Sequence, residues 1–182
     1  ERLVRLGCVC ADACALQHLY MFCGADPGWL REHAKFVIVD IVEDELKGQG
    51  CRRQNDKARP QNSGVEALTS FFEYGLLVSP VFKTGDYLTD ILSLSKAEKI
   101  DLGEAACIRI CEVVPHFRFL TDDARAKRVA ESRLGKERVI STFDLVLLGR
   151  LSGQVSRDWV ARGCRKLEAS NFCVAESWPE QI

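Results

Sequence analysis

The sequence lacks the features that would mark a membrane protein or a strongly charged binder. No apolar run approaches the roughly 18–20 residues that a helix needs to cross a bilayer. The formal net charge is −1, so no large overall charge attracts a polyanion, although local basic clusters remain able to do so. There is no internal repeat and no low-complexity tract. A chain of 182 residues with this composition is most simply one globular domain.

Metal-binding cysteine pairs are also missing, although the chain has nine cysteines. The spacings over Cys8–Cys14 and Cys107–Cys111 differ from the C-x2-C knuckles of structural zinc sites, and no histidine follows at finger spacing. We therefore interpret the thiols as small buried hydrophobes in a reducing cytoplasm. A cysteine-based metal or redox sensor is the alternative, and it requires close thiols among Cys8, Cys10, Cys14 and Cys23.

Apolar, β-rich runs alternate with helical patterns along most of the chain. Strands are predicted at residues 4–11, 36–39, 117–121 and 139–142, with a weaker run at 75–82 that contains a proline. Helices are predicted at residues 12–23, 29–33, 65–74, 84–93, 95–99, 103–114, 122–134, 143–151 and 156–167. Strands that alternate with helices predict an α/β fold, here a three-layer α/β/α sandwich around a mostly parallel sheet.

The remaining segments define the expected domain limits. Asp40 and Glu43 have capping-box spacing at the start of a helix. The polar stretch at residues 48–64 lacks periodicity and is predicted to be a loop. We expect one domain over residues 1–170 and a C-terminal tail over 171–182.

Acidic residues stand at four places where a strand should end or a helix begin. They are Asp12, Glu45, Glu104 and the pair Asp122 and Asp123. Because the carboxyl ends of parallel strands meet at one edge of a sheet, we expect these acids to converge. Converging carboxylates repel one another unless a cation lies between them. The set therefore predicts a site for a divalent metal that prefers oxygen ligands, Mg²⁺ or Mn²⁺.

Each acid also has a simpler interpretation when it is taken alone. Asp12 fits a helix N-cap, Glu45 fits a solvated surface acid, and Glu104 fits an anion in the first turn of a helix. The order and placement of the whole set favour the metal site over these separate interpretations.

The motifs around the acids resemble the PIN-domain family, which includes VapC-like toxin ribonucleases. The matching segments are Asp12-Ala13-Cys14-Ala15-Leu16, Val42-Glu43-Asp44-Glu45-Leu46, Leu102-Gly103-Glu104-Ala105, Leu120-Thr121-Asp122-Asp123 and Val139-Ile140-Ser141-Thr142. The resemblance covers residues 4 to about 152. Ala13 departs from the family pattern, which has a small hydroxyl residue there, and the loop at 48–64 is longer than compact toxins need.

This resemblance implies a metal-dependent endoribonuclease with a PIN-like fold. Asp12, Glu104, Asp122 and Asp123 would bind Mg²⁺ or Mn²⁺, with Asp122 and Asp123 competing for one position. Glu45 would be a ligand, an outer acceptor for metal-bound water, or the general base. Thr142 and Asp144 would be auxiliary residues, with Asp144 alternatively an ordinary first-turn acid of its helix.

Basic residues near these motifs predict contacts with RNA. Arg125 and Arg128 follow the fourth acidic motif, and Arg52 and Arg53 lie in the polar loop. The alternative is that these residues only form a solvated face. Single-stranded or looped RNA is the expected substrate.

The resemblance also implies a cytoplasmic homodimer with an antitoxin protein as a partner and no membrane association. The competing hypothesis is a catalytically weak PIN-like module that binds RNA or protein without turnover.

Overall fold

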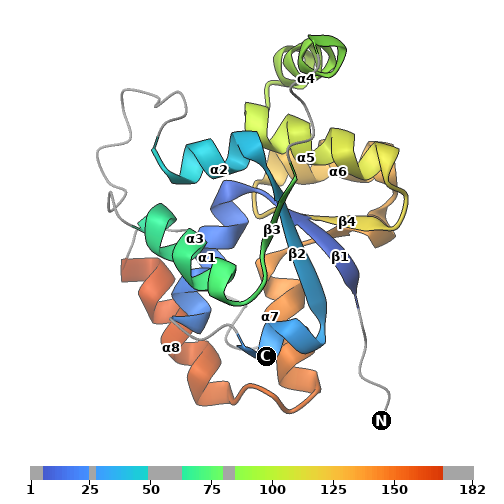
Figure 1. Cartoon of the computed structure of the whole chain (residues 1–182). Helices are drawn as coiled ribbons and strands as arrows, with labels where there is room; N and C mark the ends of the chain where they lie inside the picture. Colours follow the sequence, from blue (N-terminus) through green and yellow to red (C-terminus); the bar gives the residue numbers. More distant parts are fainter. Residues whose placement is uncertain (1–5, 25–27, 49–62, 80–84, 170–182) are drawn as a thin grey trace.

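The computed structural model describes residues 6–24, 28–48, 63–79 and 85–169. The protein has an α/β fold in which helices flank a central parallel sheet (Figure 1). The strands are β1 (Gly7–Ala11), β2 (Ala34–Val39), β3 (Leu77–Ser79), β4 (Phe117–Leu120) and β5 (Val139–Ile140). They lie in the order β3-β2-β1-β4-β5, and every neighbouring pair is parallel. The predicted α/β class and parallel sheet are confirmed.

Helices cover both faces of this sheet. They are α1 (Ala13–Cys23), α2 (Asp40–Leu46), α3 (Ser63–Glu73), α4 (Gly85–Glu98), α5 (Leu102–Val113), α6 (Ala124–Leu134), α7 (Thr142–Leu151) and α8 (Arg157–Ala169), with 3₁₀ turns η1 (Gly28–Glu32) and η2 (Lys136–Arg138). Helix α1 packs against α3, α7 and α8, whereas α5 packs against α4, α6 and the middle strands. These two groups lie on opposite sides of the sheet in Figure 1, and α2 contacts members of both.

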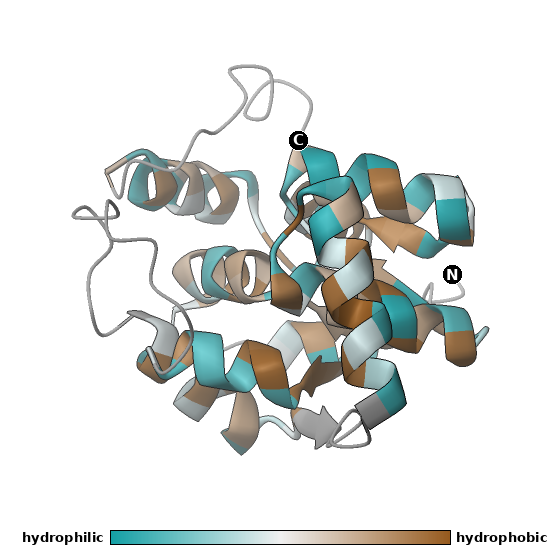
Figure 2. Ribbon diagram, turned by 90° about the horizontal axis from the view of Figure 1, so that it is seen from above, coloured by the Kyte–Doolittle hydropathy of each residue, from teal (hydrophilic) through white to brown (hydrophobic). Residues whose placement is uncertain are grey.

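The core forms where the strands meet these helices. Val9, Cys10 and Ala11 on β1 are fully buried, as a strand covered on both faces requires. Leu16 on α1 and Ile108 on α5 belong to the same buried cluster. Figure 2 shows hydrophobic residues dominating the strands and alternating with hydrophilic ones along the helices. The predicted periodicities therefore mark the sides that are buried.

A smaller cluster joins α8 to α1. Val160, Cys164 and Leu167 of α8 are buried with Phe22 of α1. A Cβ at Gly163 would lie 2.0 Å from the Phe22 ring, so this glycine is what allows the two helices to approach closely.

The capping box predicted at Asp40 is wrong. Val39 is the N-cap of α2 and makes no side-chain cap, while Asp40 is already the first helical residue. The Asp40 Oδ1 atom instead accepts a hydrogen bond from the neighbouring Ile41 amide, and Glu43 pairs with Lys47 at the exposed surface. One residue of displacement is enough to prevent a side chain from reaching the N3 amide.

The predicted break within residues 84–99 is also absent. Helix α4 is continuous from Gly85 to Glu98, and it ends where Lys99 adopts a left-handed conformation with φ 55°. The Ser95 hydroxyl donates to the Ile100 carbonyl at 2.7 Å, so this serine closes the end of the helix and does not interrupt it.

Across the described ranges 6–24, 28–48, 63–79 and 85–169, no helix is both long enough and apolar enough to span a membrane.

Candidate functional site

The predicted acids lie at the point where the sheet changes its direction of growth. The chain passes from β1 to β2 and β3 on one side, then returns to add β4 and β5 on the other. In parallel α/β sheets, the crevice outside the carboxyl ends of the strands at such a point is the usual place for a ligand. Asp12 follows β1, and Asp122 and Asp123 follow β4. The Asp12 amide donates to the Leu120 carbonyl at 3.1 Å, which ties the two strand ends together.

Asp12 is the most deeply buried of these acids, with 2% of its surface exposed. Its Oδ1 atom accepts a hydrogen bond from the Ala15 amide at 2.7 Å and caps α1. Its Oδ2 atom is buried and has no hydrogen-bond partner. Burial raises the pKa of Asp12 to about 7, and repulsion from Asp122 and Glu45 adds to the rise. The Ala15 amide and the Thr121 hydroxyl act in the opposite direction.

Glu104 approaches the same site from the start of α5. It forms a capping box with Asp101, whose amide donates to Glu104 Oε2 at 2.9 Å. Burial raises the pKa of Glu104 to about 8, and repulsion from Asp12 and Asp123 adds to it. These interactions place the carboxylates from β1, α5 and the end of β4 in one electrostatic cluster.

Glu45 reaches this cluster across the amino end of α5. Its Oε1 atom accepts a hydrogen bond from the Gly103 amide at 3.2 Å. A Cβ at Gly103 would lie 2.6 Å from Glu45 Oε2, so only glycine leaves room for the carboxylate in this position. Glu45 is half-buried and acts on Asp12, which differs from a purely solvated surface acid.

Asp122 is bonded through both of its carboxylate oxygens. Oδ2 lies 2.6 Å from His18 Nδ1 and accepts from the Thr142 hydroxyl at 2.5 Å, while Oδ1 accepts from the Thr142 amide at 2.8 Å. Although burial opposes it, the bonds from His18 and Thr142 hold the pKa of Asp122 below its usual range. Asp122 therefore remains charged and joins α1 to the start of α7.

Asp123 has a different role beside it. Its Oδ1 atom accepts from the Arg125 and Ala126 amides at 2.7 and 2.8 Å, so it caps α6 from an exposed position. The Thr121 hydroxyl accepts from the Asp123 amide at 3.2 Å and fixes the turn that separates the two acids. The two neighbouring aspartates thus point to different partners.

Thr142 and Asp144, the two predicted auxiliary residues, have different hydrogen-bond partners. Thr142 holds Asp122, as described above. Asp144 forms a capping box with Ser141, whose amide and hydroxyl both donate to Asp144 Oδ2 at 2.7 and 2.6 Å. These hydrogen bonds are typical of an acidic residue in the first turn of a helix.

The acids do not form a ready metal site as they stand. Among the described residues, no three His, Cys, Asp or Glu side chains are grouped closely enough to hold a metal ion. The bonds to His18 and Thr142 use both carboxylate oxygens of Asp122, whereas the cap made by Asp123 uses its Oδ1 atom. The donor set nevertheless suits a hard cation, because it consists of carboxylates and includes the unpartnered, buried Oδ2 atom of Asp12.

The basic residues predicted to contact RNA are only partly within the described residues. Arg125 and Arg128 lie on the first two turns of α6, next to the acidic cluster, and both are exposed. Arg52 and Arg53 lie outside the described residues, as does the predicted tail at 171–182.

Sequence reasoning missed three residues that organise this site: His18, Thr121 and Gly103. His18 lies within a run of apolar helix residues, and its partner Asp122 is 104 positions away, so no local pattern marks it. Gly103 stands inside the motif Leu102-Gly103-Glu104-Ala105, where its contact with Glu45 depends on how α2 meets α5.

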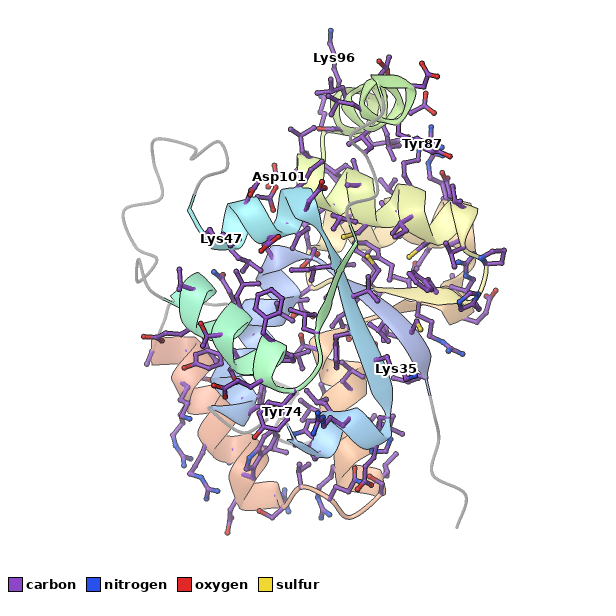
Figure 3. All side chains as sticks on the ribbon, in the orientation of Figure 1. Lys35, Lys47, Tyr74, Tyr87, Lys96 and Asp101 are labelled. Atoms are coloured by element: carbon purple, nitrogen blue, oxygen red, sulfur yellow. The ribbon has the colours of Figure 1, made fainter. Side chains whose placement is uncertain are left out.

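Two hollows in the described part of the chain lie outside the acidic cluster itself. A hollow of about 340 Å³ lies at the amino-terminal edge of the sheet, lined by Leu30, Arg31, Ala34, Lys35, Phe36, Phe71, Tyr74, Gly75 and Leu76. A second, of about 310 Å³, lies between α4 and α6. In Figure 3, Asp101 lies near the acidic end of the sheet, whereas Lys35 and Tyr74 lie toward the opposite end.

Three buried thiols contact one another beneath α5. Cys10 on β1 is hydrogen-bonded with Cys107 and Cys111, and the Cys107 thiol also donates to the Ala11 carbonyl at 3.5 Å. Burial raises the pKa of Cys107 to about 11, which keeps the thiol protonated at neutral pH. Such thiols pack as small apolar groups.

Comparison of the chain with protein-family models, with curated proteins and with solved structures finds no match.

Proposed function

We propose that the protein is a metal-dependent endoribonuclease that hydrolyses RNA phosphodiester bonds at the acidic cluster. The observation that carries this proposal is the convergence of acids from β1, α2, α5 and β4 at the switch point of a parallel sheet. Burial raises the pKa of Asp12 and of Glu104, and repulsion between the acids adds to the rise, so the surroundings do not compensate the charged forms of these carboxyl groups. Either protons or a cation must neutralise them.

The residues that would hold Mg²⁺ or Mn²⁺ are Asp12, Glu104 and Asp123. Asp12 supplies the buried Oδ2 atom that has no other partner, and its Oδ1 atom is fixed by the Ala15 amide. When bound, the ion supplies Lewis-acid stabilisation and lowers the pKa of a bound water. Asp122, because both oxygens are bonded to His18 and Thr142, positions the strand end and does not bind the ion directly.

The other residues of the cluster complete this assignment. Glu45 is held by the Gly103 amide at the rim of the cluster and would accept a proton from the attacking water. Thr121 would help to position both Asp12 and Asp123, because its hydroxyl accepts from the Asp123 amide and also interacts with the Asp12 carboxyl group. Membership of the PIN-domain family, which the motif resemblance implies, is part of the proposal.

The test is cleavage of a mixed single-stranded RNA with Mn²⁺ by the full chain and by Asp12→Asn and Glu104→Gln. Both variants should lose cleavage by at least about 10²-fold, because they remove proposed ligands. The matched control is Asp158→Asn, which removes an exposed acid in the first turn of α8, on the other side of the molecule. Equal cleavage by the wild type and both site variants would contradict the proposal.

A second readout does not depend on activity. Mn²⁺ should raise the melting temperature of the wild type and of Asp158→Asn, since a ligand that binds only the folded state stabilises it. The rise should be much smaller in Asp12→Asn. A rise of the same size in all three proteins would place the ion elsewhere.

A second candidate function is a PIN-like module that binds RNA or protein without turnover. The engagement of Asp122 by His18 and Thr142, and the absence of a preformed metal cluster among the described residues, favour it. In that case RNA binding would persist without Mn²⁺-dependent cleavage, and Asp12→Asn would change neither property.

The expected partners remain part of the proposal. An antitoxin protein would cover the acidic cluster, and a homodimer would use exposed apolar side chains. Helix α1 is unsuited to a dimer interface because α3, α7 and α8 already cover it, whereas Phe72 on α3 and Leu92 on α4 are exposed.

A further inference from the structure

A hollow to which three arginine residues contribute lies beside the acidic cluster. It has a volume of about 310 Å³ and opens between the end of α4 and the outer face of α6. Its lining residues are Glu98, Arg125, Arg128, Val129, Ser132 and Arg133. Three guanidinium groups around a hollow of this size suggest an anion as its occupant.

Two of the arginines are held in place by groups outside the hollow. Arg125 donates from Nη1 to the Lys99 carbonyl at 3.0 Å, at the residue where α4 ends in a left-handed turn. Arg133 donates from Nη1 to Glu112 Oε1 at 2.7 Å, and it shares this carboxylate with Arg109, whose Nη1 atom lies 2.5 Å from Glu112 Oε2. Binding an anion would therefore require little ordering of these two long side chains.

The charge that remains in the hollow is small and positive. Arg125 bonds only a neutral carbonyl, and Arg128 has no ion-pair partner anywhere in the described part of the chain. Glu98 offsets one of these two charges. Because Arg133 shares the Glu112 carboxylate with Arg109, it adds part of its own charge, and the positive hollow attracts a phosphodiester, which carries a negative charge.

The hollow is also correctly placed relative to the acidic cluster. Asp123 caps the amino end of α6, and Arg128 lies five residues further along that helix. At 1.5 Å per residue, the two Cα atoms differ by about 7.5 Å along the helix axis. A nucleic-acid strand with one phosphate at the cluster can therefore place a neighbouring phosphate over Arg125 and Arg128.

We infer that this hollow, defined by Arg125, Arg128 and Ser132, is a subsite for one internal phosphodiester of single-stranded RNA. The inference rests on the proposed function for its choice of substrate. Arg125 and Arg128 supply the charge, and the Ser132 hydroxyl can donate a further hydrogen bond. The Glu98 carboxylate opposes the binding of a phosphate at this subsite.

The experiment measures the affinity of the full chain for a fluorescent single-stranded RNA of mixed sequence in EDTA, where cleavage cannot occur. Arg128→Gln and Arg125→Gln should each weaken binding by about tenfold and lower the salt dependence by about one charge. Glu98→Gln should strengthen binding. The matched control, Arg165→Gln, removes an exposed arginine of α8 and should leave the affinity unchanged.

The outcomes separate this subsite from the nuclease proposal. If the arginine variants weaken binding while no protein cleaves RNA, the subsite stands and the nuclease proposal fails. If Arg125→Gln and Arg128→Gln bind like the wild type while Asp12→Asn alone loses cleavage, the subsite is wrong and the nuclease proposal stands. Binding that requires a 5′-terminal phosphate, or binding of an acidic peptide but not of RNA, would also overturn the subsite.

Discussion

The two edges of the sheet differ in chemistry more than in shape. The amino-terminal edge has the hollow of about 340 Å³, but its lining is mostly apolar, with Arg31 stacked over the Tyr74 ring. The carboxyl-terminal edge is distinguished by its ionisable groups. It holds the buried carboxylate of Asp12 and the half-buried carboxylate of Glu104, both with raised pKa values. The difference teaches that convergence of ionisable groups, and not cavity size, locates the candidate chemistry.

The reason lies in the parallel arrangement of the strands. Every strand brings the residue that follows it to the same edge, where helix amino ends also lie and favour acidic caps. Asp12 caps α1 and Asp123 caps α6 for this reason. At the opposite edge the chain enters the strands from η1 and from the turn after α3, and it brings apolar side chains such as Leu30 and Leu76.

The largest effect is expected from removing Asp122. Asp122→Ala should lower the free energy of unfolding by about 3 kcal/mol, because it leaves His18 and both Thr142 donors without their buried partner. Urea denaturation at pH 7 measures this. Asp123→Ala, which removes only an exposed helix cap, should cost about 1 kcal/mol. Equal losses in the two variants would mean that the Asp122 contacts contribute nothing beyond a cap.

The next effect concerns the raised pKa of Asp12. The folded-state pKa of about 7 lies above the usual 3.8, so the folded protein binds the Asp12 proton more tightly than the unfolded chain does. The stabilisation from this proton is complete at low pH and is lost as the pH rises through 7. Glu104 acts in the same direction up to about pH 8. Without divalent ions, the free energy of unfolding should therefore fall between about pH 4 and 8.

Asp12→Asn should remove much of that slope. Asparagine keeps the helix cap, so the variant should be more stable than the wild type by about 1–2 kcal/mol at pH 8, although it lacks cleavage. Chemical denaturation at pH 5 and pH 8 provides the measurement. A wild-type protein that is more stable at pH 8 than at pH 5 in EDTA would show that ionisation of the acidic cluster does not destabilise the folded protein.

A smaller effect is expected at Gly103. Gly103→Ala should displace the Glu45 carboxylate, whose Oε2 atom lies 2.6 Å from the added Cβ, and lower cleavage by about tenfold. Stability should change by less than about 1 kcal/mol, because alanine favours the helix. Comparison of the cleavage rate with that of Glu45→Gln tests this. Full activity in Gly103→Ala would show that RNA cleavage does not depend on the position of the Glu45 carboxylate.

The smallest effect is expected at the amino-terminal edge. Tyr74→Leu removes the ring beneath Arg31 and should cost about 0.5 kcal/mol of stability. It should leave both RNA cleavage and RNA binding in EDTA unchanged. A loss of either property larger than that caused by Gly103→Ala would mean that the hollow at this edge, and not the acidic edge, is the functional one.

Much of the fold followed from local patterns. The apolar run ending in Ala11 predicted a strand buried on both faces, and the alternation of elements predicted the parallel sheet. Element ends were less well predicted, as at Asp40, because a shift of one residue changes which backbone amide a side chain can reach. The division of work between Asp122 and Asp123 was also beyond the sequence, since it depends on His18 and Thr142, which come from other helices.

The sequence by itself determined that this is an α/β protein and that acids stand at the strand ends, because periodicity and capping act within a few residues. The tertiary structure decided which of these acids are bonded, which is left with a buried unpartnered oxygen, and that arginines from α6 meet the end of α4. Those relations join residues far apart in the chain. They arise from how packed helices bring side chains within a few ångströms of one another, and no local pattern encodes that distance.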